Sequence, residues 1–182
     1  ASLLYAEKGN LKILDFGGGM GLTYTQLIDS SPQLTNLKYN IVEGKKVCEK
    51  GKELFRDDTR IEFLESLPDT ANQFDILHIS SSLQYIEDWK GLLSLLCAYN
   101  AKYFVFSDLP AGDIETFATV QNYYESKIPC WFFSYKEIFH LFEVNMYTLI
   151  YKSNFDANIL GSNKHYPMDN FEEVLRLGHS KS

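Results

Sequence analysis

The chain has 182 residues, of which 45% are hydrophobic and 15% aromatic, so it can form one packed domain and is too apolar to be intrinsically disordered. Its 24 acidic and 17 basic residues give a net charge of −7, which disfavours binding to a nucleic-acid backbone. No apolar run reaches the roughly 18 residues of a membrane span, and the three cysteines lie too far apart for a disulfide framework or a zinc site. We therefore expect a cytoplasmic protein with no membrane insertion, no nucleic-acid partner and no bound metal. The chain begins at Ala1 without Met, which leaves open that it is trimmed, and its oligomeric state is open as well.

Short apolar segments alternate with amphipathic ones along the chain. The apolar segments predict strands at residues 11–16, 38–43, 61–64, 74–79, 103–106 and 146–151. Apolar residues at helical spacing predict helices at residues 21–30, 45–55, 89–96 and 134–141, the last opened by a Ser134–Glu137 capping box. This alternation predicts an α/β fold, a Rossmann-like doubly wound sandwich with helices on both faces, whose sheet is mostly parallel with an antiparallel last strand. We expect one domain over residues 1–182, with a core at about 11–152 and a tail at 153–182 that suits either a short helix or a final strand.

A glycine-rich turn, Asp15-Phe16-Gly17-Gly18-Gly19-Met20-Gly21, directly follows the first predicted strand. Glycines in such a turn let the backbone approach a ligand closely. The dinucleotide fingerprint G-x-G-x-x-G would need a glycine at position 22 or 24, where this chain has Leu22 and Tyr24, and no Gly-Lys-Ser/Thr of a P-loop follows. Glu43 ends the second predicted strand, where an acid can accept hydrogen bonds from ribose hydroxyls. The turn and the acid together predict a nucleoside ligand that is not a dinucleotide; a purely structural turn and a solvated acid are the alternatives.

The turn resembles motif I of the class I S-adenosylmethionine-dependent methyltransferases. Ile41-Val42-Glu43 and Ser80-Ser81-Ser82-Leu83-Gln84-Tyr85 fit the order of that family, and the resemblance extends over about residues 11–152. The chain is most similar to a group of methyltransferases that are assigned by fold and associated with bacterial surface-polysaccharide genes, through residues 15–19, 81–85, 119–121 and Trp131. The resemblance implies S-adenosylmethionine as cofactor, S-adenosylhomocysteine as product, and a small-molecule acceptor such as a sugar or surface-polysaccharide precursor. It leaves open whether the methyl group goes to oxygen, nitrogen or carbon.

The resemblance also implies which residues bind the cofactor. They lie on the glycine-rich turn and at the ends of the second, third and fourth strands: Asp15, Phe16, Gly17, Gly18, Gly19, Gly21, Glu43, Gly44, Leu64, Glu65, Ser80 and Ser81. The acid that usually contacts adenine is either Glu65 or absent, because the segment that follows the third strand is short. Ser80 and Ser81 equally suit the cap of a following helix. His78, inside an apolar strand, is expected to be a hydrogen-bonded core histidine.

Candidates for the acceptor side follow from topology alone. Gln84 and Tyr85 follow the fourth strand and Asp108 follows the fifth; these are the predicted catalytic residues, with Asp108 either a general base or a plain loop acid. Gln121, Tyr124 and Trp131 are predicted to line the substrate pocket, from an insertion whose apolar run at 128–133 forms a loop that is either a lid or packed on the core.

The same cofactor residues also suit a second function, a cofactor-binding but catalytically silent interaction module. A dehydrogenase is disfavoured by the missing dinucleotide fingerprint. Methylation of nucleic acid is disfavoured by the net charge and by Ser80-Ser81-Ser82-Leu83 standing where an Asn/Asp-Pro-Pro-Tyr/Phe motif would be needed.

Overall fold

A computed structural model of the chain describes residues 5, 8–123 and 125–153. The contacts divide the chain into two compact units. Unit 1 comprises Ala1–Ser82 with Leu95–Ser107, and unit 2 comprises Leu83–Ser94 with Asp108–Ser182. The single domain expected from the sequence stays a prediction.

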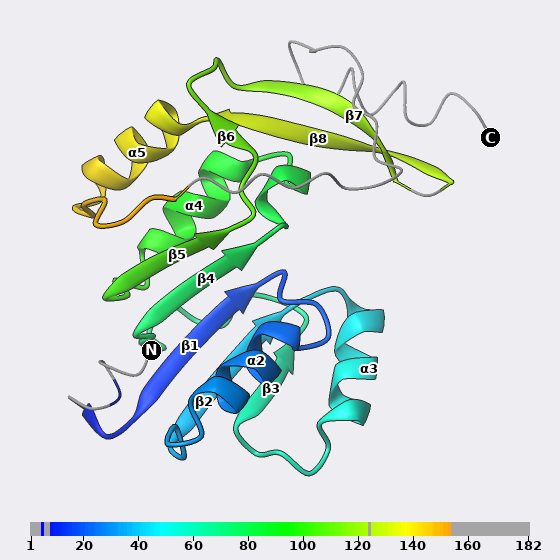
Figure 1. Ribbon diagram of the computed structural model, residues 1–182, viewed down its shortest axis with the longest axis vertical. Helices are drawn as coiled ribbons and strands as arrows, with labels where there is room; N and C mark the ends of the chain where they lie inside the picture. Colours follow the sequence, from blue (N-terminus) through cyan, green and yellow to red (C-terminus); the bar gives the residue numbers. More distant parts are fainter. Residues whose placement is uncertain (1–4, 6–7, 124, 154–182) are drawn as a thin grey trace. The chain divides into compact units, whose positions relative to one another are not determined.

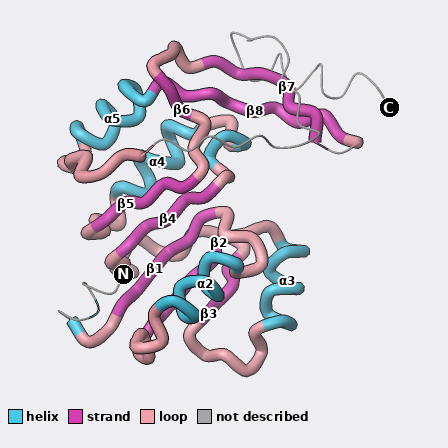
Figure 2. Tube along the Cα trace, in the orientation of Figure 1, coloured by secondary structure: helices cyan, strands magenta, loops and turns pink. Residues whose placement is uncertain are grey.

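Unit 1 is built on a five-stranded sheet in the order β3-β2-β1-β4-β5, and every pairing in it is parallel (Figures 1 and 2). Its strands are β1 (Leu11–Phe16), β2 (Leu37–Val42), β3 (Ile61–Leu64), β4 (Ile76–Ser80) and β5 (Tyr103–Ser107). Helices α2 (Leu22–Ser30) and α3 (Lys45–Leu54) follow β1 and β2, and α4 (Trp89–Cys97) precedes β5. The strand order reverses direction beside β1, which is the position where ligands bind in open α/β sheets. The predicted Rossmann-like α/β fold is confirmed.

The core of unit 1 is aromatic around Tyr24 of α2, which is fully buried. Its ring meets the rings of Tyr39 and Phe55 edge to face, with centroids 5.4 and 5.5 Å apart. Helix α3 approaches the sheet closely at Gly51, where a Cβ would lie 2.3 Å from the ring of Phe63. These contacts bury Tyr24 of α2 and Gly51 of α3, and tertiary packing of this kind is the main source of helix stability in proteins.

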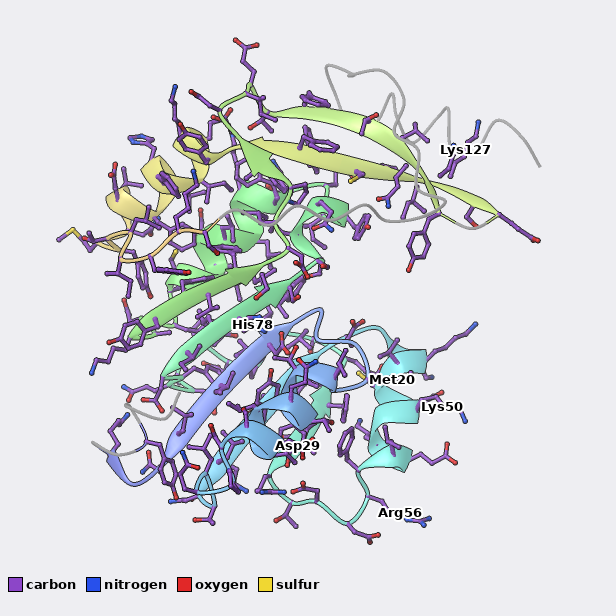
Figure 3. All side chains as sticks on the ribbon, viewed as in Figure 1. Met20, Asp29, Lys50, Arg56, His78 and Lys127 are labelled. Carbon is purple, nitrogen blue, oxygen red and sulfur yellow. The ribbon has the colours of Figure 1, made fainter. Side chains whose placement is uncertain are left out.

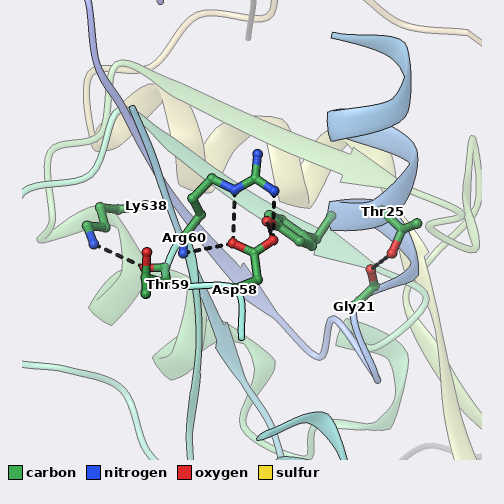
Figure 4. Close-up of polar contacts among 7 residues, drawn as sticks. Gly21, Thr25, Lys38, Asp58, Thr59 and Arg60 are labelled. Carbon is green, nitrogen blue, oxygen red and sulfur yellow. Dashed lines mark hydrogen bonds and ion pairs between the residues drawn. The ribbon is translucent and has the colours of Figure 1, made fainter. Parts of the chain in front are cut away.

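A small ionic cluster lies before the amino end of β3 (Figure 4). The carboxylate of Asp58 accepts two hydrogen bonds from the guanidinium of Arg60, at 2.9 and 2.7 Å, and a third from the hydroxyl of Tyr24. The bonds from Arg60 hold the pKa of Asp58 well below its usual range. Nearby, Lys38 donates to the carbonyl of Thr59 at 3.1 Å.

Unit 2 contains a three-stranded sheet in the order β6-β8-β7, with strands β6 (Ala111–Gly112), β7 (Phe117–Tyr123) and β8 (Ser126–Ser134). Strands β7 and β8 form an antiparallel hairpin, and the stacked rings of Phe117 and Phe132 lie 5.2 Å apart across it. Unit 2 also contains the 3₁₀ turn η1 (Leu83–Tyr85), helix α5 (Tyr135–Val144) and the part of α4 that precedes Leu95.

Three predictions of local structure were wrong. The strand expected at 146–151 is not formed, and Leu149, Ile150 and Tyr151 are exposed; alternation alone does not make a strand without a pairing partner. The antiparallel pairing lies instead in β7–β8, so the apolar run at 128–133 is part of a strand and not a loop. Of the predicted tail at 153–182, residues 154–182 lie outside the described part of the chain.

The third error concerns the start of α5. Ser134 is its N-cap residue, but the side chain makes no capping hydrogen bond. The N–H of Ser134 donates to Oγ1 of Thr116 at 2.9 Å, so a threonine from another segment does what Glu137 was expected to do.

Candidate functional site

The glycine-rich turn joins β1 to α2 through a backbone conformation that side chains rarely adopt. Gly17, Gly19 and Gly21 have φ angles of +72°, +59° and +87°. A Cβ on Gly17 would lie 2.3 Å from Cβ of Ser82, whereas a Cβ on Gly19 would meet nothing within 4 Å. Gly17 is therefore needed for packing within unit 1, while Gly19 presents bare backbone to open space.

Glu43 ties this turn to the end of β2. Its Oε1 accepts a hydrogen bond from the N–H of Gly19 at 3.0 Å, and its Oε2 accepts one from the N–H of Gly44 at 3.0 Å. A Cβ on Gly44 would also meet nothing within 4 Å. The structure thus brings together three of the predicted cofactor-binding residues around one open surface. A carboxylate has about four acceptor positions, so about two remain for a ligand.

Beneath the turn, a row of polar side chains crosses four neighbouring strands of the sheet. The hydroxyl of Tyr39 on β2 donates to Oδ2 of Asp15 on β1 at 2.7 Å. Oδ1 of Asp15 lies 2.9 Å from Nδ1 of His78 on β4, and Nε2 of His78 lies 3.1 Å from Oγ of Ser107 on β5. Figure 3 marks the position of His78 within the sheet. The expected hydrogen-bonded core histidine is confirmed.

Asp15 supports the glycine turn from below. Its side chain is fully buried, and a Cβ on Gly18 would lie 2.5 Å from its Oδ2. Burial, followed by the negative charge of Asp15, raises the pKa of Tyr39, which keeps the tyrosine protonated and donating. The structure therefore places Asp15 under the backbone of the turn, where both of its oxygens have partners inside the protein.

The ends of β3 and β4 supply the remaining predicted cofactor residues. The carbonyl of Leu64 accepts the N–H of Glu43 at 3.0 Å, and Glu65 follows it, exposed. Ser80 ends β4, and Ser81 has a positive φ of +49°.

Neither Ser80 nor Ser81 caps the next helix, because that position belongs to Asp88, whose Oδ1 accepts the N–H of Gly91 at 2.9 Å. Sequence reasoning missed Ser82, whose hydroxyl donates to the carbonyl of Phe16 at 3.0 Å and holds the end of β4 against the turn. The sequence signal that could have identified Ser82 is its place in a run of three serines directly after a buried strand.

In unit 2 the structure brings together two of the predicted acceptor-side residues. The hydroxyl of Tyr85 donates to Oε1 of Gln121 at 3.1 Å. Gln84 beside it is buried, and among the described residues its Oε1 has no hydrogen-bond partner. Burial is the main cause that raises the pKa of Tyr85, so its hydroxyl remains a hydrogen-bond donor near neutral pH.

Of the other acceptor-side candidates, the structure describes Trp131 and Asp108. The hairpin register pairs Trp131 with Ala118 and Gln121 with Ile128, which puts Trp131 and Gln121 on opposite faces of the sheet. Trp131 instead borders a cavity of about 380 Å³ together with Trp89 and Glu137. Tyr124 lies outside the described residues. Asp108 follows β5, exposed, with a positive φ of +53°.

A larger cavity of about 530 Å³ lies elsewhere in unit 1. It is lined by residues that precede β2 and β3, among them Thr35, Asp58 and Arg60. These positions are at the amino ends of parallel strands, whereas ligands of such sheets bind at the carboxyl ends. This cavity is therefore not the candidate site.

Among residues 5, 8–123 and 125–153, no three side chains of His, Cys, Asp or Glu gather where a metal ion would be held. No helix in the same residues has both the length and the apolarity to cross a membrane.

Comparison with known proteins places the fold. No family model and no curated protein matches the sequence. Among solved structures, a candidate O-methyltransferase from Nostoc punctiforme PCC 73102 aligns over 81% of this chain and 48% of its own, with 15% identity and a TM-score of 0.54. The chain has the class I methyltransferase fold.

Other methyltransferase structures match over shorter stretches. An S-adenosylmethionine-dependent methyltransferase from Mesorhizobium loti aligns over 56% of this chain and 48% of its own, with 20% identity and a TM-score of 0.42. PKMT2 from Rickettsia typhi, in complex with AdoHcy, aligns over 60% of this chain and 21% of its own, with 17% identity and a TM-score of 0.45. The chain spans between 21% and 48% of the length of these three structures.

Proposed function

We propose that this protein binds S-adenosylmethionine and transfers its methyl group to a small-molecule acceptor. The observation that carries the proposal is the open surface rimmed by Gly19, Glu43 and Gly44, at the carboxyl ends of β1 and β2. The methyltransferase fold supports it, because this edge of the sheet is where such folds bind ligands.

The residues at this surface fit a nucleoside with a sulfonium side chain. The free acceptor positions of Glu43 suit the two ribose hydroxyls, and the bare backbone of Gly19 allows close approach of the ligand. Leu64, Glu65, Ser80 and Ser81, at the ends of β3 and β4, are the proposed contacts for the rest of the cofactor. A sulfonium supplies an already activated methyl group, so the protein has mainly to bind, orient and exclude water.

The acceptor is proposed to be a polar small molecule, with a sugar or surface-polysaccharide precursor as the first candidate. The hydrogen-bonding groups of Gln84, Tyr85 and Gln121 suit such a molecule because all three are uncharged donors or acceptors. The net charge of −7 supports a partner other than nucleic acid.

Isothermal titration calorimetry tests the proposal directly, with S-adenosylmethionine, S-adenosylhomocysteine and NADH as separate titrants. We expect binding of the two sulfur compounds and none of NADH, since Leu22 and Tyr24 break the dinucleotide spacing. Binding of NADH alone would refute the proposal. Release of S-adenosylhomocysteine with a panel of acceptors then separates an enzyme from a protein that only binds the cofactor.

A further inference from the structure

The polar row under the glycine turn contains an Asp–His–Ser sequence of contacts. Nδ1 of His78 lies 2.9 Å from Oδ1 of Asp15, and Nε2 of the same ring lies 3.1 Å from Oγ of Ser107. Asp15 and His78 are register partners on adjacent strands, so the regular sheet holds their side chains next to each other. An imidazole placed between a buried carboxylate and a hydroxyl is the arrangement by which proteins make a hydroxyl reactive.

The hydrogen bonds of the row have one consistent direction. Tyr39 donates to Asp15 at 2.7 Å, so that carboxylate is an acceptor on one side. The second oxygen of Asp15 then accepts from Nδ1–H of His78, because an ionised carboxylate has no proton to give. In the neutral form that carries its proton on Nδ1, the ring presents the lone pair of Nε2 to the hydroxyl of Ser107. The chain of donors therefore runs from Ser107 to His78 to Asp15.

Ser107 is the end of this chain that a ligand can reach. It is the last residue of β5, at the same carboxyl edge of the sheet as the glycine turn, and it is half-buried, whereas Asp15 and His78 are buried. Ser80 of β4 is its register partner at that edge. Ser107 is thus the most exposed of the three residues and the point at which a proton enters the row.

We infer that Asp15, His78 and Ser107 form a proton relay that opens at Ser107 and takes the proton of a hydroxyl acceptor. The inference rests on the proposed function and makes the acceptor an alcohol or phenol. As the acceptor O–H bond breaks, its proton passes to Oγ of Ser107 while the proton of Ser107 passes to Nε2 of His78. The ring would become an imidazolium held by Asp15, and the electron pair left on the acceptor oxygen would form the new bond to the methyl carbon. The bond between that carbon and the sulfonium sulfur would break at the same time, its electron pair returning to sulfur, so that S-adenosylhomocysteine is the leaving group. No oxidant or reductant is needed.

A proton relay fits the surroundings better than an acyl-enzyme nucleophile. Acyl transfer needs N–H groups that are free to hold an oxyanion. Two N–H groups at this edge of the sheet are engaged within the protein: that of Ser81 donates to the carbonyl of Ser107 at 3.1 Å, and that of Gly17 donates to the carbonyl of Val42 at 2.9 Å. The hydroxyl of Ser107 thus has a base but no oxyanion hole formed by these groups.

The reactivity of Ser107 can be measured without knowing the acceptor. Diisopropyl fluorophosphate labels hydroxyls that have a base beside them, and the labelled residue is identified by peptide mass mapping. We expect labelling at Ser107 that Ser107→Ala abolishes, with Ser80 at the same edge as an internal control that labels at least tenfold more slowly. No label on Ser107, or equal labelling of Ser80, would overturn the relay.

Two variants of His78 separate a relay from a merely structural tie between strands. In His78→Asn the amide can still donate to Asp15 but has no base for Ser107, so labelling falls at least tenfold in a folded protein. In His78→Ala added imidazole should restore labelling, which a structural role would not predict. Labelling that is unchanged in His78→Asn, or that imidazole does not restore in His78→Ala, would overturn the inference.

Calorimetry with S-adenosylhomocysteine on Ser107→Ala keeps the two proposals apart. Its dissociation constant should stay within twofold of the wild-type value, because Ser107 lies outside the surface rimmed by Glu43. Wild-type protein that binds the cofactor product but leaves Ser107 unlabelled refutes the relay alone. Protein that labels at Ser107 but binds neither sulfur compound refutes the proposed function, and with it the assignment of a methyl acceptor to the relay.

Discussion

Replacing Glu43 by glutamine tests the candidate cofactor surface at the charged residue of its rim. The carboxylate accepts one hydrogen bond from Gly19 and one from Gly44, each of 3.0 Å, and keeps two acceptor positions open. Glutamine keeps the shape of the side chain but has only one oxygen. Its NH₂ group must face either a backbone N–H, donor against donor, or the ligand.

The size of the effect follows from these contacts. Hydrogen bonds to a charged group contribute about 1.5–3 kcal/mol, and losing 1.4 kcal/mol of binding free energy lowers affinity about tenfold. We therefore expect Glu43→Gln to weaken binding of S-adenosylhomocysteine about tenfold or more. The free energy of unfolding should fall by about 1 kcal/mol or less, because water can reach both backbone groups once the charge is gone.

Calorimetry measures the affinity and urea unfolding measures the stability. Glu62→Gln is the matched control: Glu62 is an exposed acid on β3 whose carboxylate accepts one hydrogen bond, from Asn40 at 2.8 Å, and it should leave affinity unchanged. Unchanged affinity in Glu43→Gln would show that the acid is only a solvated charge. A loss of several kcal/mol in stability would show that it is mainly part of the structural framework.

Three further perturbations test the turn, the ionic cluster and the last helix. Gly19→Val should weaken cofactor binding at least tenfold, because a φ of +59° strains a β-branched residue and shifts the backbone of the turn. The variant should still fold, because the added Cβ meets open space. Unchanged affinity by calorimetry would show that the turn is purely structural. Asp58→Asn should lower the unfolding free energy by about 1 kcal/mol at neutral pH, a modest figure because the ion pair is partly exposed. Since Arg60 lowers the pKa of folded Asp58, this stabilisation is fully present above the unfolded pKa of about 3.9 and disappears as pH falls through the folded value. The gap in unfolding free energy between wild type and variant should therefore start to narrow below about pH 4 and keep shrinking as pH falls further; a pH-independent gap contradicts this. Thr116→Val should lower the unfolding free energy by about 1 kcal/mol or more, because the N–H of Ser134 loses its acceptor. Ser134→Ala should lower it by less, because the backbone N–H at position 134 is retained. Equal losses in urea unfolding would indicate that the side chain of Ser134 caps the helix.

The parts of the fold that were predicted correctly are set by local patterns. The strands β1 to β5 follow from short apolar runs, and the turn after β1 follows from a glycine spacing that few other structures need. Glu43 was placed at the open surface because an acid at the end of the second strand is adjacent to the turn in any such sheet.

The errors arise where structure depends on partners distant in sequence. The run at 128–133 contains Pro129, which argues against a strand, yet the residue pairs with Val120 in the hairpin. The opposite faces of Gln121 and Trp131 follow from the hairpin register, in which Tyr123 pairs with Ser126, and no local signal predicted that register.

The buried row shows the same limit for side chains. The motif predicts Asp15 as a cofactor-binding residue, which stays a prediction; nothing local reveals that the parallel register also sets His78 beside it. Once that register is known, both oxygens of Asp15 have protein partners, and the acid of the motif acts from beneath the turn.

Asp15→Asn and Tyr39→Phe distinguish the charge of this row from its hydrogen bonding. An asparagine at position 15 can accept from His78 through its oxygen and donate to the hydroxyl of Tyr39 through its nitrogen, so both contacts of 2.9 and 2.7 Å can persist. Tyr39→Phe leaves one oxygen of a fully buried carboxylate without its donor, which costs about 1–3 kcal/mol. We therefore expect urea unfolding to show a smaller loss of stability for Asp15→Asn than for Tyr39→Phe, although only the first removes a charge. Labelling of Ser107 should rank them the other way, because the imidazolium needs the negative charge of Asp15 and does not touch Tyr39. If Asp15→Asn is the less stable variant, or labels as fast as wild type, the carboxylate serves the fold and not the relay.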